Sequence, residues 1–176
     1  EVALCLNPQL TAPEFVANIC DELNIEYTDG NSLKELIDKL NAYLLEAHAA
    51  GKRVVAIIDE AQQLSRDVLE EVRLLTNLET SNEKLLRIIL VGQPELQAML
   101  ARNDLRQLSQ RITARSHLSP LNAKDTAAYV RHRIRVAGGH PDVFSAAALK
   151  RMYKLSGGIP RVINVLCERA LMGTYG

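Results

Sequence analysis

The sequence predicts an α/β protein with a three-layer parallel sheet, followed by a small helical domain. Two observations support this. Through residue 118, short apolar runs alternate with longer segments whose apolar residues recur at helical spacing, which is typical of strands alternating with helices in a parallel sheet. After Pro120, only helical periodicity remains. We therefore expect an α/β core over residues 1–120 and a helical subdomain over residues 121–176.

The first predicted elements are a strand and two helices. Val2–Leu6 is a short apolar run, and Asn7-Pro8 ends it because the residue before a proline is restricted. Thr11 opens a helix with a capping-box pattern, and Ser32 opens a second helix in the same way. Gly51 is suited to end that second helix.

The central part of the chain alternates between strands and helices. Val54–Ile58 reads as a strand buried on both faces, because its residues are all apolar and mostly β-branched. Ser65 can cap a helix over residues 66–79, which residues 80–82 interrupt, and Leu85–Val91 reads as another buried strand. The remaining predicted elements of the core are short helices near 95–101 and 105–109 and a strand over 112–118.

The last third of the chain predicts a three-helix bundle. Asn122 opens the first helix, which ends at Gly138-Gly139, and a second covers Phe144–Leu155. Ser156-Gly157-Gly158 stops the second helix, and Pro160 starts a third that runs to about residue 172.

The composition is that of a soluble globular protein. The 176 residues are 47% hydrophobic and 24% charged, and no apolar run reaches the length of a membrane span. The chain starts at Glu1 directly before an apolar stretch, and we expect it to be a piece of a longer protein. Cys5, Cys20 and Cys167 are far apart, which favours buried thiols in a reducing compartment. The four histidines show no metal-ligand spacing.

Charge is distributed unevenly along the chain. Residues 1–101 contain 8 Lys and Arg against 17 Asp and Glu, and residues 102–176 contain 13 against 4. Solvated helix surfaces account for much of this difference. The same asymmetry also suits head-to-tail packing of subunits, or a basic face that binds polyphosphate or DNA.

The most informative polar residues are Asp59 and Glu60, which directly follow the strand Val54–Ile58. The carboxyl end of a parallel strand faces the crevice in which α/β sheets bind ligands. An apolar strand ending in Asp-Glu is the Walker B pattern of nucleotide hydrolases, in which Asp holds Mg²⁺ and Glu polarises the attacking water. An acidic helix cap is the alternative interpretation.

Two further polar residues fall where a nucleotide site would need them. Gln93 follows the strand Leu85–Val91, and its amide could hold the attacking water or contact the γ-phosphate, or it could cap the next helix. Arg161 lies in the first turn of the last helix, where a cation opposes the helix dipole. This placement favours a phosphate contact over a solvated arginine.

The run Leu108–Arg115 supplies arginines that could act on a neighbouring subunit. An arginine that reaches a neighbour's γ-phosphate is a recurring way to stabilise charge in phosphoryl transfer. Arg111 is the preferred candidate, and Arg106 and Arg115 remain alternatives, as does surface salt bridging.

Together these segments resemble the AAA+ ATPases of the general secretion pathway protein A (ExeA-like) family, to which transposition-helper ATPases are related. The resemblance rests on Val54–Gln62, Leu90–Leu96, Leu108–Arg115 and Gly157–Leu171, and it covers nearly the whole chain. It implies an AAA+ P-loop fold with a C-terminal helical lid, and ATP and Mg²⁺ as ligands.

The resemblance also implies a role for each site residue. Asp59 matches the Mg²⁺ ligand and Glu60 the catalytic glutamate. Gln93 matches the sensor-1 region, Arg111 the arginine finger and Arg161 the sensor-2 arginine. In the family, the ATPase domain is cytoplasmic on an inner-membrane protein, and a separate region binds peptidoglycan and helps assemble the secretin. The implied partners are further copies of the chain, packed head to tail, and a membrane protein of the secretion system.

One part of the family pattern is absent from this sequence. The Walker A loop, G-x-x-x-x-G-K-[ST], normally supplies the amides and the lysine that bind the phosphates. It would precede a strand like Val2–Leu6, so we expect the chain to begin after it and to bind ATP poorly alone. We further expect the family's preceding strand to lie between Leu85–Val91 and Ile112–Leu118.

A helicase is one alternative that the sequence argues against, and two others stay open. Asp-Glu-Ala-Gln also resembles helicase motif II, but Val-Gly-Gln-Pro and Gly-Gly-Ile-Pro-Arg are not helicase features. The main alternative is a non-hydrolysing module that binds partners or DNA. Within the family, a pilus-biogenesis or transposition role is the alternative to secretion.

Overall fold

A computed structural model describes residues 1–6, 10–80 and 83–173. The chain divides into two compact units, Glu1–Arg115 and Ser116–Gly176. The strand end expected at Asn7-Pro8 and the helix interruption expected around residues 81–82 lie outside the described residues.

Unit 1 contains a parallel three-stranded sheet in the order β1-β2-β3. The strands are β1 (Val2–Cys5), β2 (Val54–Ile58) and β3 (Leu86–Leu90). Ala3 pairs with Ala56, and Ala56 pairs with Ile88, so the three strands are in parallel register. The predicted α/β class with a parallel sheet is confirmed.

The helical elements of unit 1 are α1 (Ala12–Glu22), α2 (Leu33–Ala49), η1 (Ala61–Gln63), α3 (Arg66–Leu75), α4 (Pro94–Leu100), η2 (Asn103–Leu105) and α5 (Arg106–Arg111). Helices α1, α2 and α3 begin directly after the predicted caps Thr11, Ser32 and Ser65. Thr11 and Ser32 both form the predicted capping boxes. Helix α3 stops at Leu75, short of the predicted 79, because Glu79 instead forms an antiparallel bridge with Lys84.

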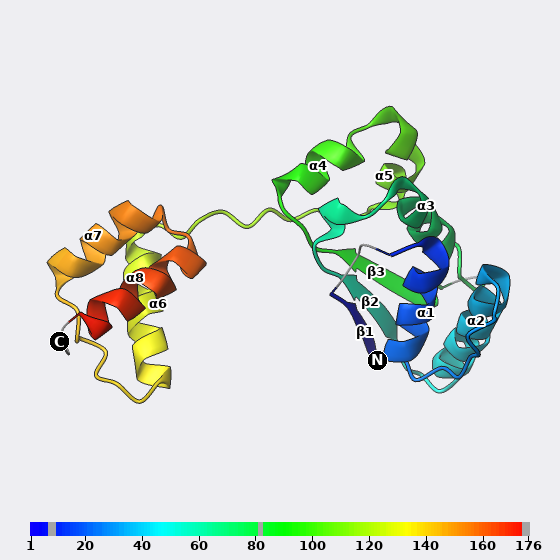
Figure 1. The fold of residues 1–176 in the computed structure, drawn as a ribbon, viewed down its shortest axis with the longest axis horizontal. Helices are drawn as coiled ribbons and strands as arrows, with labels where there is room; N and C mark the ends of the chain where they lie inside the picture. Colours follow the sequence, from blue (N-terminus) through cyan, green and yellow to red (C-terminus); the bar gives the residue numbers. More distant parts are fainter. Residues whose placement is uncertain (7–9, 81–82, 174–176) are drawn as a thin grey trace. The chain divides into compact units, whose positions relative to one another are not determined.

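The core of unit 1 lies between one face of the sheet and the helices. Helix α1 packs on β1, α2 and α3, as Figure 1 shows. Phe15 and Ile19 of α1, Leu40 of α2, Ile58 of β2 and Leu69 of α3 are all fully buried. Cys5 and Cys20 are buried free thiols, and burial raises the pKa of each to about 11.

The opposite face of the sheet is partly exposed. Val2 is 56% exposed, Leu4 40% and Ile89 48%. Helix α1 packs on β1, whereas these side chains of β1 and β3 are partly open to solvent.

The strand predicted over Ile112–Leu118 is wrong. Residues 112–122 have no regular structure, and Leu118 is 92% exposed. A strand needs a neighbour that pairs with its backbone groups. In the described sheet, β3 is paired only with β2, and residues 112–118 do not extend the ladder beyond it.

Unit 2 is the predicted bundle of three helices: α6 (Ala123–Val136), α7 (Ala146–Ser156) and α8 (Pro160–Met172). Its small core consists of Val130, Leu149, Met152 and Ile163. None of the helices in the described part of the chain is long and apolar enough to cross a membrane.

Candidate nucleotide site

The candidate site begins where β2 ends. The backbone N–H of Asp59 donates to the carbonyl of Cys5 at 3.0 Å, and Val91 N–H donates to the carbonyl of Ile58 at 2.8 Å. The end of β2 is therefore tied to both neighbouring strands, and the ladder bonds continue up to the first polar residue. This places Asp59 at the carboxyl edge of the sheet, as the sequence predicts.

Glu60 turns the chain sharply out of the sheet. Its backbone has φ 50° and ψ 34°, in the left-handed region. A glutamate in this region is uncommon and is held there at a free-energy cost of order 1–3 kcal/mol. Ala61 N–H donates to the carbonyl of Val91 at 2.9 Å, which ties the turn to the end of β3. Strained backbone of this kind is frequent at functional sites.

The side chains of Glu60, Gln62 and Gln93 form one hydrogen-bonded group. Glu60 Oε2 accepts from Gln62 Nε2 at 2.6 Å and from Gln93 Nε2 at 3.3 Å. Gln62 Oε1 accepts from the backbone N–H of Gln93 at 3.1 Å. We call these three residues, with Asp59, the strand-end cluster. Gln93 precedes α4, and η1 and α4 lie together beyond the ends of β2 and β3 (Figure 1).

Asp59 keeps one oxygen available to a ligand. Its Oδ1 accepts from the backbone N–H of Glu60 at 2.8 Å, and Oδ2 has no hydrogen bond to another described residue. Magnesium binds through one or two carboxylates, with water and phosphate oxygens completing its shell. Among the described residues, no three Asp, Glu, His or Cys side chains gather to hold a metal alone. Asp59 thus fits a Mg²⁺ ion that is carried mainly by phosphates.

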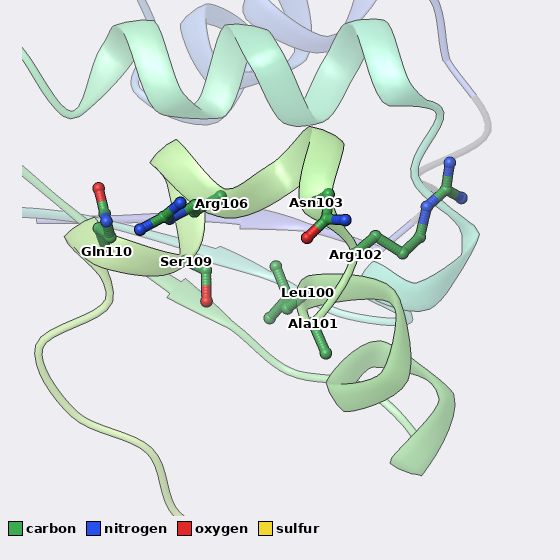
Figure 2. A pocket seen from close by; sticks show the side chains of 7 residues that line it. All are labelled: Leu100, Ala101, Arg102, Asn103, Arg106, Ser109 and Gln110. Carbon is green, nitrogen blue, oxygen red and sulfur yellow. The ribbon is translucent and has the colours of Figure 1, made fainter.

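The arginines predicted for trans action are held in different ways. Arg111 Nη1 lies 3.4 Å from Thr76 Oγ1 at the end of α3. Arg115 Nη2 donates to Ser109 Oγ at 2.7 Å. Arg106 has no hydrogen bond or ion pair with another described residue; it lines a shallow cavity of about 310 Å³. Figure 2 shows Arg106 in this cavity beside Ser109 and Gln110, with Asn103 nearby. Among the described residues, Arg111 bonds to Thr76 and Arg115 to Ser109, and none of the three arginines bonds to the strand-end cluster.

Arg161 belongs to unit 2, at the start of α8. It is exposed and forms no hydrogen bond or ion pair with another described residue. No acidic residue lies in the first turn of α8 to offset it. The corner before it is built by Gly157 and Gly158, both with positive φ, and Gly158 O accepts from Leu121 N–H at 2.9 Å.

The sequence reasoning assigned no role to Gln62. Its position two residues after Glu60 was visible, but only the turn of η1 shows that its amide faces back toward Gln93. No signal in the sequence identifies this role, because nothing in Asp-Glu-Ala-Gln shows the positive φ of Glu60.

Comparison with known proteins supports the family predicted from the motifs. The AAA domain family matches residues 2–100. General secretion pathway protein A of Aeromonas hydrophila is 53% identical over 175 residues, which is 99% of this chain and 32% of that protein. The chain therefore spans about a third of the length of this relative.

Solved structures of low identity share the fold. Cdc6p from Pyrobaculum aerophilum has a TM-score of 0.72 at 16% identity, over 99% of this chain and 48% of that one. The ORC2 protein of Aeropyrum pernix, in ADPNP-ADP complexes, has a TM-score of 0.67 at 18% identity, over 98% of this chain and 49% of that one. The chain belongs to the AAA domain family, and over nearly its whole length it is similar to general secretion pathway protein A.

Proposed function

We propose that this chain is part of an ATP-hydrolysing AAA+ domain, with the strand-end cluster as its catalytic edge. The observation that carries the proposal is the hydrogen-bonded group of Glu60, Gln62 and Gln93 beside Asp59. A carboxylate and an amide that converge from two neighbouring strands are suited to hold a water molecule against a phosphate.

Each residue of the cluster has a distinct proposed role. Asp59 would hold Mg²⁺ through Oδ2, and the ion, when bound, would neutralise charge on the phosphates. Glu60 would orient the attacking water and accept its proton, through the carboxylate that now receives two amide bonds. Gln93 would hold the same water or the γ-phosphate through its amide.

Two arginines would complete the site from outside the cluster. Arg111 would act on the nucleotide of a neighbouring subunit, and Arg161 would contact the phosphates as the sensor-2 residue. Both are proposals from the family pattern. Neither arginine forms an ion pair with a described carboxylate, and Glu79, whose pKa Lys84 and then Arg111 lower, pairs with Lys84. An arginine outside an ion pair can meet a phosphate without first giving up a carboxylate.

The biological setting follows from the 53% identical relative. We propose that the full-length protein is a secretion-pathway ATPase that helps assemble the secretin through the cell wall. In this proposal the AAA+ domain is cytoplasmic, the parent is anchored in the inner membrane, and the subunits pack head to tail. A membrane protein of the secretion system is the proposed partner, and a region outside this chain would bind peptidoglycan.

A non-hydrolysing binding module is the second candidate, because these 176 residues contain no G-x-x-x-x-G-K-[ST] loop. ATP hydrolysis by the full-length protein separates the two. The first proposal predicts Mg²⁺-dependent turnover that Asp59→Asn reduces by about 10² or more, as for loss of a metal-held charge. A full-length protein that binds its partner but releases no phosphate would establish the second candidate. We also propose that the chain by itself is inactive.

A further inference from the structure

We infer that Gln62 is a positioning residue that sets where the Glu60 carboxylate lies. The inference rests on the proposed function, since it assigns to Gln62 the orientation of the residue proposed to activate water. It goes beyond the family pattern, which supplied no role for Gln62.

The Gln62 side chain donates one hydrogen bond through its amide nitrogen and accepts another through its amide oxygen. Nε2 donates to the Glu60 carboxylate at 2.6 Å, and Oε1 accepts from the backbone N–H of Gln93 at 3.1 Å. A flipped amide would point an N–H at the Gln93 N–H and an oxygen at a carboxylate, so only one orientation satisfies both partners. Gln62 therefore links the turn after β2 to the turn after β3.

This link fixes the direction of the Glu60 side chain. Glu60 projects from a left-handed residue, so its backbone alone gives the carboxylate an unusual starting direction. Without Gln62, the carboxylate would retain only the longer 3.3 Å bond from Gln93 Nε2, and Gln93 is itself exposed. A single long bond from an exposed side chain leaves several rotamers accessible. With Gln62 in place, the Glu60 carboxylate is held from two elements.

Gly92 keeps the space that the Gln62 amide occupies. A Cβ at position 92 would lie 2.7 Å from Gln62 Oε1, and 3.0 Å from Leu96 Cδ2. Gly92 does not have a positive φ. The backbone conformation therefore does not require glycine at position 92. Glycine is needed there because the Gln62 oxygen approaches so closely. Gly92 and Gln62 are thus predicted to act as a pair.

The pairing gives a test by double-mutant cycle in the full-length protein. Gln62→Ala should lower kcat about 10-fold, a part of the roughly 10² expected for loss of Glu60, and leave KM for Mg·ATP unchanged. Gly92→Ala should lower kcat to a similar extent, because the new methyl displaces the amide. In the Gln62→Ala background, Gly92→Ala should cost little further, because the oxygen it would meet is gone. The Leu96 contact is present in both backgrounds and cancels in the cycle.

The outcomes distinguish this inference from the proposed function. Additive losses in kcat for the two substitutions would overturn the role of Gln62. So would a Gln62→Ala protein with unchanged kcat when Glu60→Gln loses turnover. Both outcomes leave the proposed function intact. A rise in KM equal to the fall in kcat/KM would also overturn the role of Gln62, because that pattern marks nucleotide binding. A wild-type protein that does not hydrolyse ATP, or a Glu60→Gln variant with unchanged turnover, would overturn the proposed function and this inference with it.

Discussion

The strand-end cluster and the arginine segment, residues 102–115, hold their polar side chains in different ways. In the cluster, Glu60 and Gln62 bind a residue from beyond the next strand, so their bonds span two elements. In the arginine segment some bonds are local and others reach α3 or the residue that follows it: Arg111 lies 3.4 Å from Thr76 Oγ1, and Asp104 pairs with Arg66. Arg102 pairs with Asp104 two residues away, and Arg115 bonds to Ser109 in the preceding helix.

For the proposed oligomer, the difference predicts which parts of the site form within one subunit. Bonds that span two strands position a side chain to within a few tenths of an ångström, as a catalytic group requires. Arg106 has no hydrogen bond or ion pair with another described residue, and the only side-chain bond of Arg111 within the described part of the chain is a 3.4 Å contact with a neutral hydroxyl. A charged phosphate is a stronger partner for a guanidinium than such a hydroxyl. On this comparison, we propose that the water-activating groups are pre-formed within unit 1 and that the cation comes from a neighbouring subunit.

The largest expected effect tests the arginine segment. In the full-length protein, Arg111→Ala should lower turnover by about 10³, because a trans arginine stabilises charge that develops only in the transition state. Nucleotide affinity of an isolated subunit should be unchanged. Mixing Arg111→Ala subunits with Glu60→Gln subunits should restore part of the activity, because some interfaces then combine an intact carboxylate with an intact arginine.

Arg106→Ala and Arg115→Ala serve as matched controls from the same segment. Arg115 is held by Ser109, so its loss should have little effect on turnover. A 10³ loss for Arg106→Ala with a normal Arg111→Ala protein would transfer the trans role to Arg106. Mixtures that never exceed the sum of their parts would show that no arginine acts between subunits.

Glu60→Gln tests the cluster side of the comparison. Turnover should fall by roughly 10² or more, because the amide cannot accept a proton from water, while ATP binding is retained. The measurement is phosphate release together with nucleotide affinity by calorimetry. Loss of affinity equal to the loss of turnover would mean that Glu60 holds the nucleotide and does not act on water.

Gly158→Ala tests how strongly the turn that positions Arg161 depends on glycine. A Cβ at Gly158 would lie 1.9 Å from the carbonyl oxygen of Leu121, and φ is +78°. Gly157 also has a positive φ, +60°, but its Cβ would meet open space. We expect Gly157→Ala to reduce the local stability of unit 2 by about 1 kcal/mol, and Gly158→Ala to reduce it by about 2 kcal/mol.

Amide hydrogen exchange in α7 and α8 measures this local stability. Equal protection losses for the two variants would show that backbone strain alone, and not the contact with Leu121, requires the glycines. The result bears on Arg161, whose position at the start of α8 depends on this corner.

The smallest expected effect is that of replacing Glu71 on α3, measured as a change in the free energy of unfolding. Unlike Glu60, Glu71 is a carboxylate without hydrogen-bonding amide partners among the described residues. It is 5% exposed, and its Oε1 has no hydrogen-bond partner among the described residues. Burial raises its pKa above the ordinary 4.5, and the charge of Glu70 adds to this. The charged form therefore opposes folding above the raised pKa. This penalty disappears as the pH falls toward 4.5, where the folded state holds the proton.

Glu71→Met should accordingly raise the free energy of unfolding by about 1 kcal/mol at pH 7, and by less at pH 4. Urea unfolding followed by circular dichroism at both pH values measures the difference. A destabilising Glu71→Met at neutral pH would show that Glu71 has a favourable partner in the full-length protein.

Much of the fold could be predicted from local sequence signals. Ser32, Ser65 and Asn122 all cap the helices that follow them, because a cap needs only a short side chain and a nearby N–H. The strand over Ile112–Leu118 could not be predicted correctly in the same way. A strand depends on a pairing neighbour, and alternating apolar residues do not reveal whether one is present.

Only the site residues at the ends of β2 and β3 could be predicted to lie together. Asp59, Glu60 and Gln93 could be placed together because parallel neighbouring strands end at the same edge. Gln62 could not, because its role depends on the left-handed turn at Glu60, and Asp-Glu-Ala-Gln gives no sign of positive φ. The positions of Arg111 and Arg161 relative to the nucleotide remain predictions from the family pattern.

The left-handed backbone at Glu60 also determines which amino acids the position can accept during evolution. Asn, Asp and Gly adopt this conformation readily, whereas Val, Ile and Thr do not. A library selected only for a folded, abundant protein should therefore be enriched in Gly and Asn at position 60. A library selected for function should retain glutamate despite its poorer backbone preference. Comparing the residues that the two selections enrich at position 60 would distinguish what the turn requires from what the carboxylate requires.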